Sequence, residues 1–151
     1  MKPRLVIGLG NPLMSDDGVG CAAAAQLARD TRLPESVEVI CGGTDLLRHA
    51  GRMVGREQVI IIDAIQSDGE PGSVALLDRA DPSIEARQEH AHHLSAVQAV
   101  RLLEMTTSTR FALVAISISS AGIGSALSPA LADRMPAIVD RLLQELDHTP
   151  G

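Results

Sequence analysis

The chain has 151 residues, a length that suits one domain with a buried core. Its 13 basic and 19 acidic residues give a net charge of −6, which argues against a nucleic-acid backbone as partner. With one phenylalanine and no tyrosine or tryptophan, it also lacks the aromatic platforms on which single-stranded nucleic acids stack. The composition therefore indicates a globular protein whose core is built from Leu, Ile, Val, Ala and Met.

The N-terminal segment and the cysteines suggest where the protein works. Residues 1–4 lead directly into a strand and contain no apolar signal region. No apolar run approaches the roughly 20 residues needed to cross a bilayer. Cys21 and Cys41 are too few for a disulfide framework and do not form a CxxC pair, so we expect two buried, reduced thiols. These features predict a cytoplasmic protein without membrane contact.

The first predicted elements are a strand at residues 4–9 and an alanine-rich helix at residues 18–28. The apolar run of the strand is typical of one covered on both faces. A glycine-containing turn follows it, and Asp16 and Asp17 come just before the helix. A carboxylate at a helix start is explained by capping and by the positive helix end. This explains one of the two carboxylates and leaves the other open to a functional role.

Strands and helices continue to alternate along the rest of the chain. Thr44 or Asp45 can cap a helix at 45–53, while Ser128 and Pro129 suit the start of the last helix. A further helix is predicted at 94–103, and further strands are predicted at 37–41, 59–63, 74–77 and 111–118. This pattern predicts an α/β fold: a three-layer sandwich with a mostly parallel, twisted five-stranded sheet and helices on both faces, in one domain over residues 1–151.

Carboxylates follow two strands that end at the same edge of this sheet. Asp17 comes after the first strand, and Asp63 ends the most apolar strand, which should be central. Ligands gather beyond the carboxyl ends of such strands. The charge of Asp63 needs a partner there, either a ligand or the backbone amides of a neighbouring loop.

Three histidines, His90, His92 and His93, precede the helix at 94–103. They either belong to a solvated loop or contribute a nitrogen ligand beside the two aspartates. Carboxylates with imidazole suit borderline divalent ions such as nickel or zinc. Nucleophile and phosphate motifs are missing: Ser15 has no GxSxG context, and Leu13 stands where a dinucleotide fingerprint needs its third glycine.

Taken together, these motifs resemble those of the hydrogenase maturation proteases, endopeptidases that process nickel-containing hydrogenase large subunits. The segment Gly8-Leu-Gly-Asn-Pro-Leu-Met-Ser-Asp-Asp-Gly-Val-Gly20 is similar to the family signature GxGNxLxxD[DE]GxG. Gly42-Gly-Thr44, Ile61-Ile-Asp-Ala-Ile65 and His92-His-Leu-Ser95 resemble the later family motifs, in order and over nearly the whole chain.

The resemblance implies a metal site formed by Asp17, Asp63 and His92, with Asp17 and Asp63 also serving catalysis. Asp17 matches the second acid of the family motif, so Asp16 is left as the cap of the following helix. His92 is preferred to His93 because Leu94 then matches the family's apolar position. His90 stands where the family has a serine, and it is a second candidate ligand.

The implied function is an endopeptidase that removes a C-terminal extension from the hydrogenase large-subunit precursor after nickel insertion. The precursor supplies the nickel, for which other divalent ions can substitute. The ion polarises the scissile carbonyl or activates water, and a carboxylate assists as base. A transient complex with a large partner suggests a monomer.

Three alternatives remain open. The chain could be a metal-sensing or chaperone-like module that binds the large subunit without cutting it. It could also act on another metalloprotein or as a general peptidase. Peptidyl-tRNA hydrolases share Gly8-Leu-Gly-Asn-Pro12, but the lack of tyrosine, the different continuation and the net charge of −6 disfavour that family.

Overall fold

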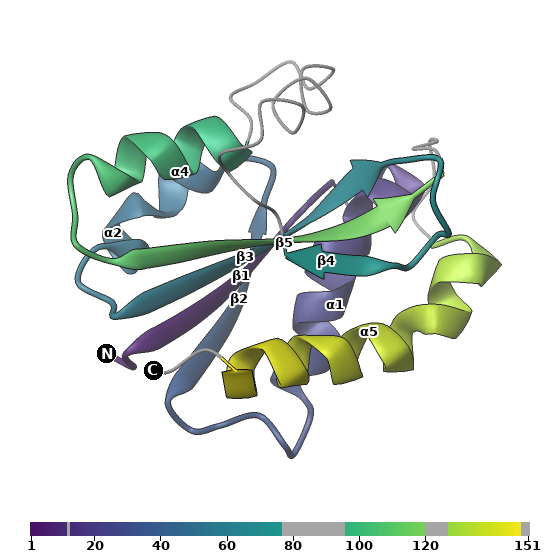
Figure 1. The fold of residues 1–151 in the computed structure, drawn as a ribbon, viewed down its shortest axis with the longest axis horizontal. Helices are drawn as coiled ribbons and strands as arrows, with labels where there is room; N and C mark the ends of the chain where they lie inside the picture. Colours follow the sequence, from purple (N-terminus) through teal and green to yellow (C-terminus); the bar gives the residue numbers. More distant parts are fainter. Residues whose placement is uncertain (12, 77–95, 120–126, 149–151) are drawn as a thin grey trace.

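The centre of the molecule is a twisted five-stranded sheet (Figure 1). A computed structural model describes residues 1–11, 13–76, 96–119 and 127–148. The strands lie in the order β2-β1-β3-β5-β4, and only β4 runs antiparallel to its neighbour. The strand bounds are β1 (Arg4–Leu9), β2 (Val37–Gly43), β3 (Gln58–Gln66), β4 (Val74–Leu76) and β5 (Arg110–Ile118).

Helices cover both faces of the sheet, which confirms the predicted three-layer sandwich (Figure 1). Helices α1 (Val19–Ala28) and α5 (Pro129–His148) lie on one face. The short helix α2 (Ala50–Met53) and α4 (Ala96–Glu104) lie on the other. Two one-turn 3-10 helices, η1 (Ser15–Gly18) and η2 (Leu46–His49), precede α1 and α2. None of the helices in the described part of the chain is long and apolar enough to span a membrane.

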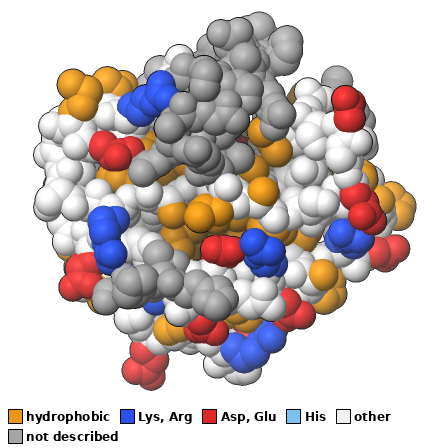
Figure 2. Space-filling view, viewed as in Figure 1, with side chains coloured by type: hydrophobic (Ala, Val, Ile, Leu, Met, Phe, Trp, Pro, Cys, Tyr) orange, Lys and Arg blue, Asp and Glu red, His pale blue; other side chains and the backbone are white. Residues whose placement is uncertain are grey.

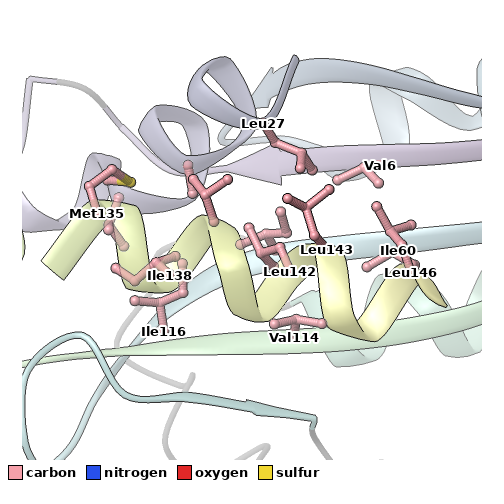
Figure 3. Close-up of a cluster of buried hydrophobic side chains, with 14 of the residues drawn as sticks. Val6, Leu27, Ile60, Val114, Ile116, Met135, Ile138, Leu142, Leu143 and Leu146 are labelled. Carbon is pink, nitrogen blue, oxygen red and sulfur yellow. The ribbon is translucent and has the colours of Figure 1, made fainter. Parts of the chain in front are cut away.

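Two apolar clusters hold the layers together, because successive strand residues point to opposite faces. On the α1 and α5 face, Val6 and Ile60 pack with residues of both helices (Figure 3). On the α2 and α4 face, Leu5 and Ile61 pack with residues of those helices. The side chains of β1 and of the first half of β3 are nearly all buried, as expected for strands covered on both sides.

Helix α5 presents a long apolar stripe to the sheet. Its buried residues recur every three or four positions and include Leu131, Met135, Ile138, Leu142 and Leu146 (Figure 3). Its start matches the prediction: Ser128 Oγ accepts the Leu131 N–H at 3.5 Å, and Pro129 takes the first helical position. At its other end, the Leu146 carbonyl accepts Arg4 Nη2–H at 2.7 Å, which attaches α5 to the start of β1.

The element boundaries differ from the prediction at several places; for example, β2 was predicted to end at residue 41 and continues to Gly43. Strand β3 continues past Asp63 to Gln66, because β5 pairs with it along this whole length. The predicted helix at 45–53 is η2 followed by α2, and Asp45 precedes η2 without a side-chain capping bond. The predicted helix at 94–103 appears as α4, and residues 94 and 95 lie outside the described part of the chain.

Candidate active site

A crevice is expected where the chain switches sides of β1. From β1 the chain passes first to β2 on one side and later to β3 on the other. Ligands bind at such switch points, beyond the carboxyl ends of the strands. The pairing of β1 with β3 ends at Gly8 and Ile62, whereas β3 continues beside β5. Asp63 therefore lies at the point where β1 leaves the sheet.

The turn after β1 depends on close backbone contacts. Gly10 has a φ of 139°, a conformation that side-chain-bearing residues avoid, and a Cβ there would collide with the Asp17 carbonyl oxygen. Gly8 and Gly20 also touch, since a Cβ on Gly8 would collide with the Gly20 carbonyl oxygen. The glycines of the motif thus let α1 pack directly against β1 and bring Asp17 back to the turn.

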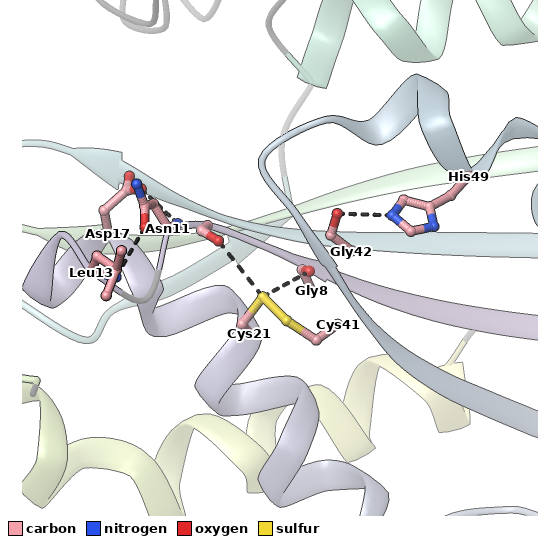
Figure 4. The surroundings of a disulfide bond; sticks show 9 residues. Gly8, Asn11, Leu13, Asp17, Cys21, Cys41, Gly42 and His49 are labelled. Carbon is pink, nitrogen blue, oxygen red and sulfur yellow. Dashed lines mark hydrogen bonds between the residues drawn. A yellow bond between two sulfur atoms is a disulfide. The ribbon is translucent and has the colours of Figure 1, made fainter. Parts of the chain in front are cut away.

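Asp17 lies in η1 and is half-buried. Its Oδ2 accepts the Asn11 N–H at 2.9 Å, and its own N–H donates to the Met14 carbonyl at 3.1 Å (Figure 4). Gly10 N–H donates to the Gly43 carbonyl at 2.8 Å, which connects the turn to the end of β2. The carboxylate is therefore held by the same backbone that forms the turn.

Asp16 has a structural role, but not the predicted one. Its side chain is buried, and Oδ1 accepts the Ser128 N–H at 2.7 Å, at the start of α5. The prediction that Asp16 caps the helix after it is wrong. The 3-10 turn separates Asp16 from α1, whose N-cap is Gly18. Asp16 instead joins η1 to a helix 112 residues away in the sequence.

Asp63 lies within β3, where it is poorly solvated. Its pKa is raised from 3.8 to about 7, mainly by burial and to a smaller extent by the nearby charge of Asp17. The Ala64 N–H donates to Asp63 Oδ1 at 2.8 Å and opposes this shift. The structure thus brings Asp17 and Asp63 close enough for their charges to repel each other.

The predicted histidine ligand cannot be placed beside these acids. His92, like His90 and His93, lies outside the described residues. Among the residues that the structure does describe, no group of three His, Cys, Asp or Glu side chains is arranged to hold a metal ion. The described part of the site therefore consists of the Asp17 and Asp63 pair.

The two cysteines are joined in a disulfide, so the prediction of two buried, reduced thiols is wrong. Their Cα atoms are 5.0 Å apart (Figure 4). Cys41 pairs with Gly8 in the sheet, and α1 packs on Gly8 through Gly20, next to Cys21. These contacts bring the cysteines together. Cys21 is buried, whereas Cys41 is exposed.

Two further features were not anticipated from the sequence. His49 in η2 places Nε2 2.8 Å from the Gly42 carbonyl oxygen, at the end of β2 (Figure 4). An open, polar pocket of about 510 Å³ lies beyond the ends of β3 and β5 and is lined by Gln66, Ser67, Asp68, Gly69 and Ser119. Only the strand register, which brings residues 66–69 beside Ser119, could have revealed this pocket.

The chain is similar to known proteins of one family. A family model described as hydrogenase maturation protease matches residues 21–145. The hydrogenase 2 maturation protease of Escherichia coli is 33% identical over 104 residues, which cover 68% of this chain and 63% of that protein. A relative from Methanocaldococcus jannaschii is 34% identical over 96 residues, 62% of either chain. The chain thus spans less than two thirds of the length of these two relatives.

Solved structures show the same architecture over nearly the whole chain. The hydrogenase maturating endopeptidase HybD from Escherichia coli superposes with a TM-score of 0.76 at 26% identity, and it covers 95% of this chain and 91% of its own. The family model reaches from α1 to α5, so it includes both Asp63 and the histidine segment. The chain belongs to the hydrogenase maturation protease family.

Proposed function

We propose that this protein is a nickel-dependent endopeptidase that removes the C-terminal extension of a nickel-containing hydrogenase large-subunit precursor. The observation that carries the proposal is the raised pKa of Asp63 beside Asp17 at the switch point of the sheet. Two carboxylates that repel each other gain from a divalent cation placed between them. Family membership supplies the class of substrate.

In this proposal, Asp17, Asp63 and His92 contact the nickel ion carried by the precursor. Oxygen and imidazole nitrogen donors suit a borderline divalent ion. His90 and His93 remain alternative nitrogen donors. The ion contributes positive charge that polarises the scissile carbonyl or activates a water molecule.

Asp63 is the candidate base for the hydrolytic step. Its pKa of about 7 belongs to the metal-free protein; a nearby cation lowers that pKa, so Asp63 is ionised and able to accept a proton near neutral pH. Asp63 would accept a proton from the attacking water and return it to the leaving amine. Asp17, held by the Asn11 N–H, contributes a fixed negative charge toward the cation.

The substrate is a polypeptide, and the structure offers space for one near Asp63. The polar pocket at residues 66–69 and Ser119 begins three residues beyond Asp63 along the chain. On the face in Figure 2, acidic and basic side chains are interspersed, and hydrophobic side chains lie near the middle. Such a mixed surface suits a protein partner better than a polyanion. We further propose that the protein acts in the cytoplasm as a monomer.

The test is a processing assay with a purified large-subunit precursor in nickel-loaded and nickel-free forms. Intact-mass spectrometry should show loss of a C-terminal peptide only from the loaded precursor. Asp17→Asn and Asp63→Asn should each lower the initial rate at least 100-fold, because each removes a charge from the cation site. Asp45→Asn is the matched control, since Asp45 is an exposed acid without a side-chain capping bond.

Other outcomes would replace this proposal. A stable complex with the loaded precursor and no change in mass would indicate the non-cleaving binding module. Cleavage that proceeds equally without nickel would indicate a general peptidase. Normal rates in both aspartate variants would remove these residues from the mechanism.

A further inference from the structure

The disulfide links the two elements that hold the Asp17 turn in place. Cys21 lies on α1, four residues after Asp17, and Cys41 lies two residues before Gly43 near the end of β2. The Gly43 carbonyl accepts the Gly10 N–H at 2.8 Å. The disulfide and this hydrogen bond therefore connect the turn and its following helix to the same end of β2.

Among the described residues, the regular pairing of β1 with β2 does not continue into the Gly10 turn. The regular pairing of β1 with β2 is interrupted between Gly8 and Leu9, so that Leu9 pairs with Gly43 and Gly42 is skipped. The Gly42 carbonyl instead contacts His49. Without the disulfide, the Gly10–Gly43 hydrogen bond and the packing around it would have to hold β2 against the turn.

We propose that Cys21–Cys41 is a reversible redox site whose state sets how firmly the Asp17 turn is held. In the disulfide form, the end of β2 is covalently bound to α1 and the turn opens rarely. In the dithiol form, the turn opens more often, and the Asn11 N–H separates more often from Asp17. The consequence for metal capture rests on the function proposed above.

The two cysteines differ in solvent exposure, as a reversible redox site requires. Cys41 is exposed and Cys21 is buried, so a dithiol reductant can reach only the Cys41 side. A reductant thiolate attacks Cys41 Sγ, the bond between the two Sγ atoms breaks, and Cys21 leaves as a thiolate that takes up a proton. The second reductant thiol then displaces Cys41, so two electrons and two protons pass to the protein and the reductant becomes a disulfide.

The buried thiol produced by reduction has a hydrogen-bond acceptor ready. Cys21 Sγ lies 3.3 Å from the Gly8 carbonyl oxygen and 3.8 Å from that of Gly10 (Figure 4). A reduced Cys21 can donate its S–H to Gly8 without a change in backbone position. Reduction therefore leaves the core intact and releases mainly the exposed end of β2.

Amide hydrogen exchange measured by NMR tests the proposal on the metal-free wild-type protein, oxidised and then reduced with dithiothreitol. We expect the Gly10 and Asn11 amides to exchange about tenfold faster after reduction, because local opening governs their exchange. Re-oxidation should restore the slow rates. The Val114 amide, in the central sheet, should show no change.

The Cys21→Ser/Cys41→Ser double variant is the control for the reductant. Its turn amides should exchange at the rate of reduced wild type, with or without dithiothreitol. Nickel titrated into the oxidised and reduced wild type should bind several-fold more tightly to the oxidised form. Equal exchange in the two states, or free thiols in the oxidised protein by alkylation and mass, would overturn the proposal. These readouts need no precursor, so a failure of the processing assay does not affect them.

Discussion

Asp17 and Asp63 come from two regions that hold a carboxylate in different ways. The turn after β1 supplies Asp17 together with a backbone donor, the Asn11 N–H, so that the charge is accommodated within the turn itself. Strand β3 supplies Asp63 in a partly buried position beside the Ala64 N–H donor, and the pKa of Asp63 rises to about 7 because its carboxylate is poorly solvated. The turn thus stabilises the charge of Asp17 with a backbone donor, whereas the surroundings of Asp63 in β3 disfavour its charged form.

The two aspartates should therefore respond to different perturbations. The position of Asp17 depends on turn geometry, so changes of the backbone should disturb it most. The ionisation of Asp63 depends on solvation and neighbouring charge, so changes of pH or of bound cations should disturb it most.

The largest expected effect comes from breaking the turn with Gly10→Ala. A Cβ at this position meets the Asp17 carbonyl oxygen, and the φ of 139° is unfavourable for alanine. Urea unfolding should show a loss of about 3 kcal/mol in the free energy of unfolding. Gly51→Ala is the control: a Cβ there meets nothing within 4 Å, so stability should change by about 1 kcal/mol or less. Similar results for both variants would contradict the role of the turn.

The substitution Asp63→Asn in the metal-free protein tests whether the position in β3 raises the pKa of Asp63. The folded state keeps the Asp63 proton up to about pH 7, while the unfolded chain loses it near 3.8. Because the folded state binds more protons in this window, stability falls as pH rises from 3.8 to 7. Relative to wild type, the variant should gain about 2.7 kcal/mol of stability between pH 5 and pH 8, because each pKa unit is worth about 1.4 kcal/mol. A stability difference that is constant between these pH values would contradict the raised pKa.

The pH dependence of nickel affinity should also report the ionisation of the Asp63 carboxyl. A cation competes with the proton on Asp63, so nickel affinity should increase about tenfold between pH 6 and pH 8. Isothermal titration calorimetry at several pH values measures this increase. The increase should be smaller in Asp63→Asn, which cannot ionise at this position, and an equal increase in both proteins would assign it to another group.

The smallest effect is expected from Asp16→Ala, which tests whether the role of Asp16 differs from that of Asp17. The substitution leaves the buried Ser128 N–H without its carboxylate acceptor, at a cost of about 1 kcal/mol. Nickel affinity should remain within twofold of wild type, whereas Asp17→Asn should reduce it strongly. A large loss of affinity in Asp16→Ala would show that Asp16 also serves the metal.

The sequence predicted the layers of this fold well, because they follow local patterns. The apolar runs at β1 and β3 and the stripe of α5 predict buried strands and a covering helix without knowledge of their partners. The extension of β3 beyond Asp63 was missed, since a carboxylate after an apolar run resembles a strand end. Its pairing with β5 is a tertiary contact that overrides that local signal.

Both aspartates of the candidate site could be proposed from the sequence, but the contacts around them could not. Asp17 follows from the glycine motif, but the partner of Asp16 is Ser128, which no local pattern indicates. The Cys21–Cys41 bond likewise joins a helix to a strand that approach each other only after α1 packs on β1. Long-range contacts of this kind have no signature in a single sequence.

The bond between Arg4 and the Leu146 carbonyl has a consequence for the synthesis of the chain. Strand β1 is made well before α5, which covers Val6 and Ile60. During synthesis, one apolar face of the nascent sheet therefore remains uncovered until α5 has left the ribosome. Nascent chains that do not yet include α5 should thus be prone to aggregate and dependent on chaperones.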